Sequence, residues 1–93
     1  MCIFLCNESE VLAIFYLINP LRYNAYKAIN DLQLLNLNMH IITGDPSLST
    51  NRIAKNLKIT NYIKNASIQD KLVYIKKLQK KGSKVMMIGD GIN

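Results

Sequence analysis

Three short segments of the sequence bring together residue types that can bind a phosphate group or a divalent cation. Thr43, Gly44 and Asp45 supply a hydroxyl, a flexible backbone and a carboxylate after an apolar run, where a following helix would point free N–H groups at an anion. In Gly-Asp-Gly at 89–91, the glycines let the backbone approach a ligand and the carboxylate offers Mg²⁺ a hard oxygen. Lys71 lies in the first turn of a predicted helix, where the helix dipole does not favour a cation.

Each of these segments also has a plainer interpretation. Thr-Gly-Asp is compatible with an ordinary capped turn, Lys71 with a surface lysine, and Gly-Asp-Gly with a glycine-rich turn that binds nothing. The order and spacing of the three are more informative than any one alone, because each segment follows or opens a predicted element.

The elements that would position these segments alternate between strands and helices. Residues 11–18 are continuously apolar, with β-branched and aromatic members, which predicts a strand covered on both faces. A helix is predicted over 23–35 and a second strand over 39–43. Asp45 is then expected to cap a helix with Pro46 at its first position. The apolar positions expected to face inward from these two helices are Ala25, Ala28, Ile29, Leu32, Leu35, Ile53, Ala54 and Leu57.

The second half of the chain continues this alternation. Residues 67–70 have the pattern of a helix-opening capping box with Asp in place of Glu, and Lys-Lys-Gly at 80–82 predicts where that helix ends. Residues 84–88 predict another strand, so the loops at 43–45 and 89–91 should lie side by side at the carboxyl edge of one parallel sheet. The side chains expected to face inward from this helix are Leu72, Ile75 and Leu78.

Composition limits the classes of protein to which the chain can belong. Its 93 residues, with 49% hydrophobic and 19% charged, predict one small globular domain with a packed core. The net charge of +6 arises mostly from lysines between 55 and 84, which indicate a solvated helix surface or a basic interaction face. Aromatic residues are not interleaved with these lysines as base stacking requires, so nucleic acid is not an expected partner.

Neither the cysteines nor the apolar runs indicate a metal centre or a membrane span. Cys2 and Cys6 have no second pair and no nearby histidine to complete a four-ligand site, and two thiols fit a reducing, cytoplasmic setting. The longest apolar run, residues 11–18, is far shorter than the ~20 residues that cross a bilayer as a helix. The chain by itself is therefore expected to be soluble.

Five motifs taken together resemble one family. They are Asn-Pro-Leu-Arg at 19–22, Ile-Ile-Thr-Gly-Asp at 41–45, Asp-Lys at 70–71, Lys-Leu-Gln at 77–79, and Val-Met-Met-Ile-Gly-Asp-Gly-Ile-Asn at 85–93. In this order they are similar to the second half of the phosphorylation domain of P-type ATPases, which has a haloacid dehalogenase-like fold. The Leu-Gln pair and the isoleucine before the final asparagine resemble the heavy-metal subgroup, which transports copper, zinc or cadmium.

This resemblance implies a fold, a domain assignment and a function. The fold would be α/β, a Rossmann-like (haloacid dehalogenase-like) parallel sheet with helices on both faces, and incomplete. Residues 1–93 would be a partial phosphorylation domain, with residues 1–10 as the tail of the preceding nucleotide-binding domain. In the parent protein ATP hydrolysis would drive export of a heavy-metal ion. The domain would lie at the cytoplasmic face of the membrane, with the other domains of the pump as its partners.

The resemblance also assigns the site. Thr43, Gly44 and Asp45 would hold the phosphoryl group derived from ATP as it transfers and hydrolyses, and Lys71 would neutralise its charge. Asp90 would bind Mg²⁺, with Asn93 beside it. Such a site works by positioning and charge neutralisation around a covalent aspartyl phosphate. The residues implied are Thr43, Gly44, Asp45, Lys71, Asp90 and Asn93.

Several positions depart from the family pattern. The phosphorylated aspartate of an Asp-Lys-Thr-Gly-Thr segment is absent, so the chain alone is expected to form no phosphoenzyme. Asn19 and Ile68 stand where the family usually has Asp and Pro. Asn36 and Lys58 stand where it usually has Gly, and a non-glycine residue in a left-handed turn costs on the order of 1 kcal/mol.

Two other functions remain open at the level of the sequence. A soluble haloacid dehalogenase-type phosphatase would share the Gly-Asp-Gly-x-Asn motif, although Thr-Gly-Asp and Leu-Gln favour the pump. A non-catalytic basic interaction module would rest on the lysine-rich region alone.

Overall fold

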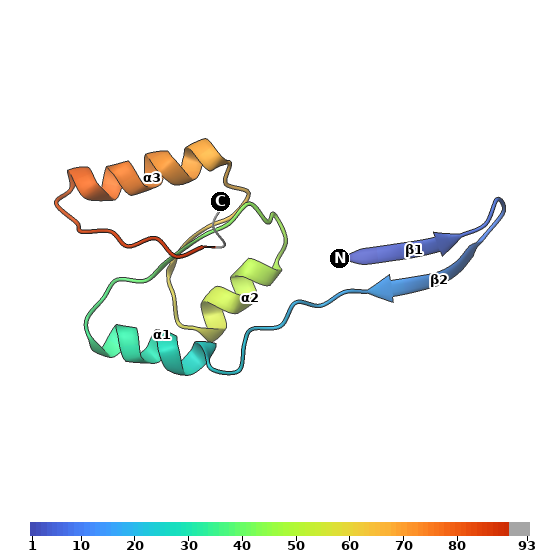
Figure 1. Ribbon diagram of the computed structural model, residues 1–93, viewed down its shortest axis with the longest axis horizontal. Helices are drawn as coiled ribbons and strands as arrows, with labels where there is room; N and C mark the ends of the chain where they lie inside the picture. The colour runs from blue at the N-terminus through green and yellow to red at the C-terminus, as the bar shows by residue number, and fades with distance from the viewer. Residues whose placement is uncertain (90–93) are drawn as a thin grey trace.

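The computed structural model describes residues 1–89 and divides them into a hairpin and an α/β body (Figure 1). The hairpin consists of β1 (Cys2–Cys6) and β2 (Val11–Tyr16). The body contains α1 (Ala25–Leu34), β3 (His40–Ile42), α2 (Ser49–Asn56), β4 (Asn61–Ile63) and α3 (Ile68–Lys80).

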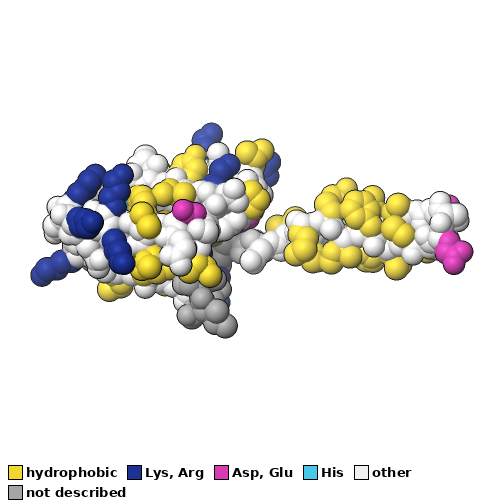
Figure 2. Space-filling view, turned by 90° about the horizontal axis from the view of Figure 1, so that it is seen from above, with side chains coloured by type: hydrophobic (Ala, Val, Ile, Leu, Met, Phe, Trp, Pro, Cys, Tyr) yellow, Lys and Arg dark blue, Asp and Glu magenta, His cyan; other side chains and the backbone are white. Residues whose placement is uncertain are grey.

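The hairpin extends away from the body (Figures 1 and 2). β1 and β2 pair antiparallel, and Asn7 Oδ1 closes the turn by accepting hydrogen bonds from the backbone N–H groups of Ser9 and Glu10. The strand predicted from residues 11–18 is confirmed, but the prediction that both its faces are covered is wrong. Phe15 is 53% exposed, because a two-stranded ribbon presents both faces and has no second layer to cover them. The partner strand β1 was not predicted.

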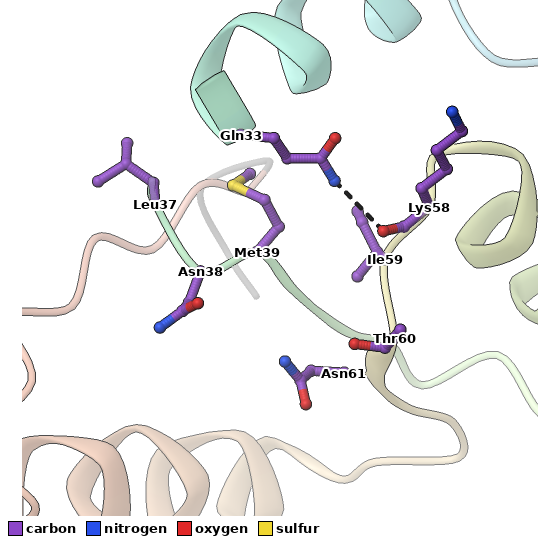
Figure 3. A pocket seen from close by; sticks show the side chains of 8 residues that line it. All are labelled: Gln33, Leu37, Asn38, Met39, Lys58, Ile59, Thr60 and Asn61. Atoms are coloured by element: carbon purple, nitrogen blue, oxygen red, sulfur yellow. Dashed lines mark hydrogen bonds between the residues drawn. The ribbon is translucent and has the colours of Figure 1, made fainter. Parts of the chain in front are cut away.

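The body is organised by a parallel pair of strands, β3 and β4, joined through α2. His40 lies opposite Asn61 and Ile42 opposite Ile63, and the Thr43 N–H donates to the Ile63 carbonyl at 3.0 Å, which extends the ladder past β3. In Figures 1 and 3, α3 lies on one side of this pair and α1 on the other. The expected α/β, incomplete Rossmann-like fold is therefore confirmed, with only two of its strands paired in the described residues.

Helix α1 lies within the predicted range but is one-sided in its contacts. Ile29 and Leu32 are half-buried, whereas the predicted inward positions Ala28 and Leu35 are exposed, because α1 ends at Leu34 and touches the body over a narrow face. The Gln33 side-chain amide donates to the carbonyls at the end of α2, on Leu57 at 3.2 Å and Lys58 at 3.3 Å.

Helix α2 begins later than predicted. Its N-cap is Leu48 and its first residue is Ser49, so the prediction that Asp45 caps the helix with Pro46 at its first position is wrong. The Asp45 carboxylate instead accepts a hydrogen bond from the Ser47 N–H at 2.8 Å, which closes a separate turn before the helix. The helix ends at Asn56, close to the predicted end.

The left-handed turns inferred from the sequence are present. Asn36 has φ 59° after α1, and Lys58 has φ 56° after α2. Gly82 has φ 91° after α3, as predicted for its end. Asparagine tolerates this conformation, but lysine pays the steric cost of its Cβ there.

Helix α3 opens with the predicted capping box. The Ser67 Oγ accepts from the Asp70 N–H at 3.1 Å, and the Asp70 carboxylate accepts from the Ser67 N–H at 2.8 Å. Ile75 and Leu78 are half-buried as expected, whereas Leu72 is exposed. Capping thus fixes the start of α3 even though few of its side chains are well covered.

The core is smaller than the composition predicts. The buried residues of the described chain all lie in α2 or in the segments that flank α2 and β4, and most of the large apolar side chains elsewhere are exposed. The expectation of a well-packed core is wrong, because two strands and three short helices offer too little surface to cover one another. The buried residues are Thr50, Ala54, Leu57, Ile59 and Ala66.

The strand predicted over 84–88 does not form, although the segment is apolar. Met86 and Ile88 are largely exposed, and no ladder pairs this segment with another described residue. A strand exists only when a partner satisfies its backbone N–H and C=O groups, and β4 occupies one edge of β3. The predicted contact between loops 43–45 and 89–91 lies outside the described residues, since it involves Asp90.

Candidate functional site

Hydrogen bonds between two loops hold the Thr-Gly-Asp segment at the carboxyl ends of β3 and β4. The Thr43 carbonyl accepts from the Ala66 N–H at 2.9 Å, and the Asp45 carbonyl accepts from the Asn65 N–H at 3.3 Å. Ala66 is buried and directly precedes Ser67, the cap of α3. The end of β3 is therefore fixed against the start of α3.

Gly44 is exposed, and neither its backbone conformation nor its packing requires glycine. A Cβ added there would meet the Ala66 carbonyl oxygen at 3.4 Å, which is an ordinary van der Waals contact. Alanine at this position would therefore not disturb the fold. The absence of a side chain leaves the backbone beside Thr43 open to a ligand.

The Asp45 carboxylate is turned toward the start of α2. It accepts hydrogen bonds from the Ser47 N–H at 2.8 Å and the Ser49 hydroxyl at 3.0 Å. These bonds, that from the Ser47 N–H first, hold the pKa of Asp45 below its ordinary value. The Asp45 N–H in turn donates to the Thr43 Oγ1 at 3.1 Å, so the loop is braced from within.

Lys71 lies one turn into α3. Its backbone N–H donates to the Ser67 carbonyl at 3.1 Å, and its side chain is half-buried. Among residues 1–89, no carboxylate forms an ion pair with it. The structure thus brings Thr43 and Gly44 to the start of the helix that carries Lys71, where the positive end of the helix dipole favours an anion.

The magnesium prediction rests on Asp90, which lies outside the described residues together with Asn93. Within residues 1–89, no three His, Cys, Asp or Glu side chains gather as a metal site would need. Cys2 and Cys6 are exposed free thiols at opposite ends of β1, about 13 Å apart along a strand of this length, too far apart to share an ion. Carboxylate and amide oxygens are nevertheless the ligand types that Mg²⁺ takes, so Asp90 and Asn93 fit it chemically.

Sequence reasoning missed one polar pair that positions the site. His40 Nδ1 lies 2.8 Å from the Tyr74 hydroxyl, and the two rings meet edge to face with centroids 5.8 Å apart. This contact joins β3, which leads to Thr43, to α3, which carries Lys71. The residues are 34 apart in the chain. No local pattern links them, so only the packing of α3 on β3 could reveal the pair.

A shallow hollow lies at the other end of the strand pair (Figure 3). It encloses about 160 Å³ and is lined by residues that precede β3 or open β4. Gln33 and Lys58 meet at its rim, where the Gln33 side-chain amide donates a hydrogen bond to the Lys58 carbonyl, and Thr60 and Asn61 line the side nearer α3. Because it opens at the amino ends of β3 and β4, it is separate from the Thr43 loop.

Comparison with known proteins decides the family. The family described as haloacid dehalogenase-like hydrolase matches residues 3–93. The chain belongs to this family. Individual proteins are also similar to most of the chain, and the names of the three given below refer to copper.

Three such relatives come from distant organisms. A copper-transporting ATPase of Helicobacter pylori is 38% identical over 87 residues, 94% of this chain. A probable copper-importing P-type ATPase A of Enterococcus hirae is 36% identical over 92 residues, 97% of the chain. A probable copper-transporting ATPase of Arabidopsis thaliana is 35% identical over 86 residues, 92% of the chain. The expected resemblance to heavy-metal P-type ATPases is confirmed.

The match covers only a small part of each relative. The chain spans 12% of the Helicobacter protein, 13% of the Enterococcus protein and 9% of the Arabidopsis protein. No solved structure matches the chain. Within residues 1–89, no helix is both long and apolar enough to cross a bilayer.

Proposed function

We propose that the chain is part of the phosphorylation domain of an ATP-driven heavy-metal P-type ATPase, and that Thr43, Gly44 and Lys71 contact the phosphoryl group. The parent would hydrolyse ATP at the cytoplasmic face of a membrane and move copper or a similar ion across it. Names of the similar proteins support this assignment, because they are copper-transporting or copper-importing ATPases.

One observation carries the proposal for the site. The hydrogen bond from the Ala66 N–H to the Thr43 carbonyl, 2.9 Å long, ties the end of β3 to the turn that opens α3. The Thr43 hydroxyl and the open backbone at Gly44 thereby lie at the carboxyl edge of a parallel strand pair, beside the start of the helix that carries Lys71. Open α/β sheets bind phosphate at this edge.

The chemistry of phosphoryl transfer suits such an arrangement, since the protein mainly positions the group and neutralises its charge. Lys71 would neutralise negative charge on the phosphoryl oxygens, and the Thr43 hydroxyl would donate a hydrogen bond to one of them. Asp45, held by Ser47 and Ser49, would keep the loop in shape. In the described conformation Asp45 therefore positions the loop and does not itself contact the phosphoryl group.

Two further ligands are proposed outside the described residues. Asp90 would hold Mg²⁺ with Asn93 beside it, and the ion would neutralise phosphate charge and orient its oxygens. The chain has no Asp-Lys-Thr-Gly-Thr segment to supply a nucleophile. We therefore expect it to bind phosphate analogues but not to become phosphorylated.

Analogue binding tests the site. Methylphosphonate, a phosphate analogue that needs no nucleophilic carboxylate, would be titrated into the full chain with and without Mg²⁺, with amide NMR shifts of Gly44 and Ala66 as the readout. Lys71→Ala should weaken binding about tenfold, as expected for loss of one charge-assisted contact. Lys76→Ala, an exposed lysine of the same helix, is the matched control and should leave the affinity unchanged.

Gly44→Ala gives an independent test. Its Cβ fits the folded chain, so the variant should keep the far-UV spectrum and melting temperature of the wild type while losing analogue affinity. If Lys71→Ala, Gly44→Ala and the omission of Mg²⁺ all leave the affinity as it was, these residues are ordinary surface turns and the proposed site is wrong.

The missing nucleophile is tested separately. Incubation with ATP and Mg²⁺ should give no acid-stable phosphoenzyme and no phosphate release above background. Turnover that survives both Asp45→Asn and Asp90→Asn would show that the chemistry lies elsewhere in the chain.

A further inference from the structure

The outer face of α3 carries a concentration of positive charge that the phosphate site does not use. Lys76, Lys77 and Lys80 are exposed and, being one, three and four residues apart, share one face of the helix. The opposite side of α3, with Tyr74 and Leu78, is half-buried against the body. We name the three lysines the outer lysine face.

Among residues 1–89, no acidic residue forms an ion pair with this face, and the carboxylate of Asp70 in the same helix is bound by Ser67. From residue 71 to 84 the chain has six lysines and no aspartate or glutamate. Among residues 1–89, the ion pair that forms joins Lys27 to Asp31 on α1, far from α3 in sequence. Figure 2 shows Lys and Arg side chains over the body, several of them at the end away from the hairpin, and acidic side chains on both the body and the hairpin turn. All twelve Lys and Arg residues lie between residues 22 and 84, outside the hairpin, whose charged side chains are Glu8 and Glu10.

We propose that the outer lysine face binds the anionic headgroups of a lipid bilayer. This inference rests on the proposed function, because a transporting ATPase works beside a membrane. Three ammonium groups on one helix face match a plane of separate negative charges. Each lysine close to such a surface raises the binding constant about fivefold.

Neighbouring side chains favour lipid over nucleic acid as the partner. Val73 is 63% exposed and lies on the same helix face one turn before Lys77, so an apolar group accompanies the cations to the headgroup level. The aromatic ring of α3, Tyr74, is turned inward to His40. The face also has no arginine, so it lacks both a stacking ring and a guanidinium fork for bases.

Vesicle binding by the full chain tests this inference. Sedimentation with vesicles of phosphatidylcholine and phosphatidylglycerol should retain the chain at low salt and release it at high salt, since exposed charges are screened. Replacing Lys76, Lys77 and Lys80 together by Gln should weaken binding about 100-fold, the product of three fivefold effects. The matched control replaces Lys55, Lys58 and Lys64 by Gln, which removes the same charge elsewhere and should cost much less.

Three results would overturn the inference. Equal loss in both triple variants would mean that net charge alone drives binding. Equal binding to pure phosphatidylcholine would assign it to exposed apolar residues such as those of the hairpin. A labelled single-stranded DNA bound as tightly as the anionic vesicles, with the same variant sensitivity, would make nucleic acid the better partner. The methylphosphonate titration is independent, because the triple variant leaves Thr43, Gly44 and Lys71 intact.

Discussion

The hairpin and the α2–β4 region use similar apolar residues to opposite effect. Phe4 and Phe15 in the hairpin are each more than half exposed, whereas Ile59, at the entry to β4, is 6% exposed. All buried residues of the described chain lie between 50 and 66. An apolar run thus predicts that a strand forms, but the layers packed on the strand determine whether it is buried.

This contrast separates local from collective stabilisation. β1 and β2 depend on their ladder and on cross-strand pairs, and a hairpin on its own is at best marginal in water. Around Ile59, in contrast, side chains of α2 and of the residues after it are buried, and the Ile59 N–H donates to the Ala54 carbonyl at 2.8 Å. The body should therefore respond to core substitutions and the hairpin should not.

The largest expected effect tests this difference directly. Ile59→Ala should lower the free energy of unfolding by about 3 kcal/mol, the usual cost of emptying a buried site. Phe15→Ala should cost less than about 1 kcal/mol, because its ring is already half in water. Urea unfolding followed by far-UV circular dichroism would compare them. If Ile59→Ala does not fold, Ile59→Val, expected to cost about 1 kcal/mol, takes its place. A costlier Phe15→Ala would reverse the comparison.

Removal of the α3 cap should have the next largest effect on the body. Ser67→Ala leaves the Asp70 N–H without its acceptor and should cost about 1 kcal/mol. Ser83→Ala is the control, since Ser83 contributes its backbone N–H to the end of the helix and keeps it in the variant. Similar melting temperatures for both variants would mean that the capping box contributes nothing to the body.

A gain of stability is expected at the end of α2. Lys58→Gly should stabilise the body by about 1 kcal/mol or less, because glycine adopts φ 56° without the steric cost of a Cβ. Lys58→Ala removes the long side chain but keeps the Cβ, so it should bring no such gain. Asn36→Gly should gain less, since asparagine already tolerates φ 59°. Thermal melts of the three variants would rank them, and an equal gain from Lys58→Ala would refute the backbone explanation.

Acid should weaken the body slightly. Hydrogen bonds from Ser67, the side-chain bond first, hold the pKa of Asp70 below its ordinary value, and those of Ser47 and Ser49 do the same for Asp45. A carboxyl group whose folded pKa is depressed contributes stability that is present above its unfolded value, about 3.9, and is lost as pH falls below it. Urea midpoints measured from pH 6 downward should therefore decline below about pH 4. Asp70→Asn and Ser67→Ala should both reduce the fall of the urea midpoint below pH 4. If the midpoint falls as steeply in both variants as in the wild type, the Ser67–Asp70 bonds are not its cause.

Local patterns in the sequence were enough for the features that depend on a few neighbouring residues. The capping box at Ser67 and the left-handed glycine at Gly82 were predicted, because each is set by backbone geometry within one turn. The left-handed position of Lys58 was instead inferred from the family pattern, which usually has glycine there. The same local reasoning failed at Asp45, where the nearby Ser47 N–H competes with the helix for the carboxylate.

Features that depend on distant partners could not be predicted in this way. β4 has only three residues and begins with Asn61, too short and polar for a strand signal, yet it pairs with β3. Residues 84–88 have the stronger signal but form no ladder with the described chain. Thr43 and Gly44 were correctly expected at a strand end, whereas the Ala66 bond that fixes them and the His40–Tyr74 pair arise from tertiary packing.

Gln33 gives the body a connection between segments that are otherwise held by few contacts. Its side-chain amide donates hydrogen bonds to the carbonyls of Leu57 and Lys58, so a residue of α1 caps the end of α2. When α1 detaches, these two carbonyls lose the Gln33 hydrogen bonds and must bond to water instead. The last turn of α2 is then less stable. Amide hydrogens in the two segments should then exchange with solvent as one cooperative unit, while those of the hairpin exchange independently.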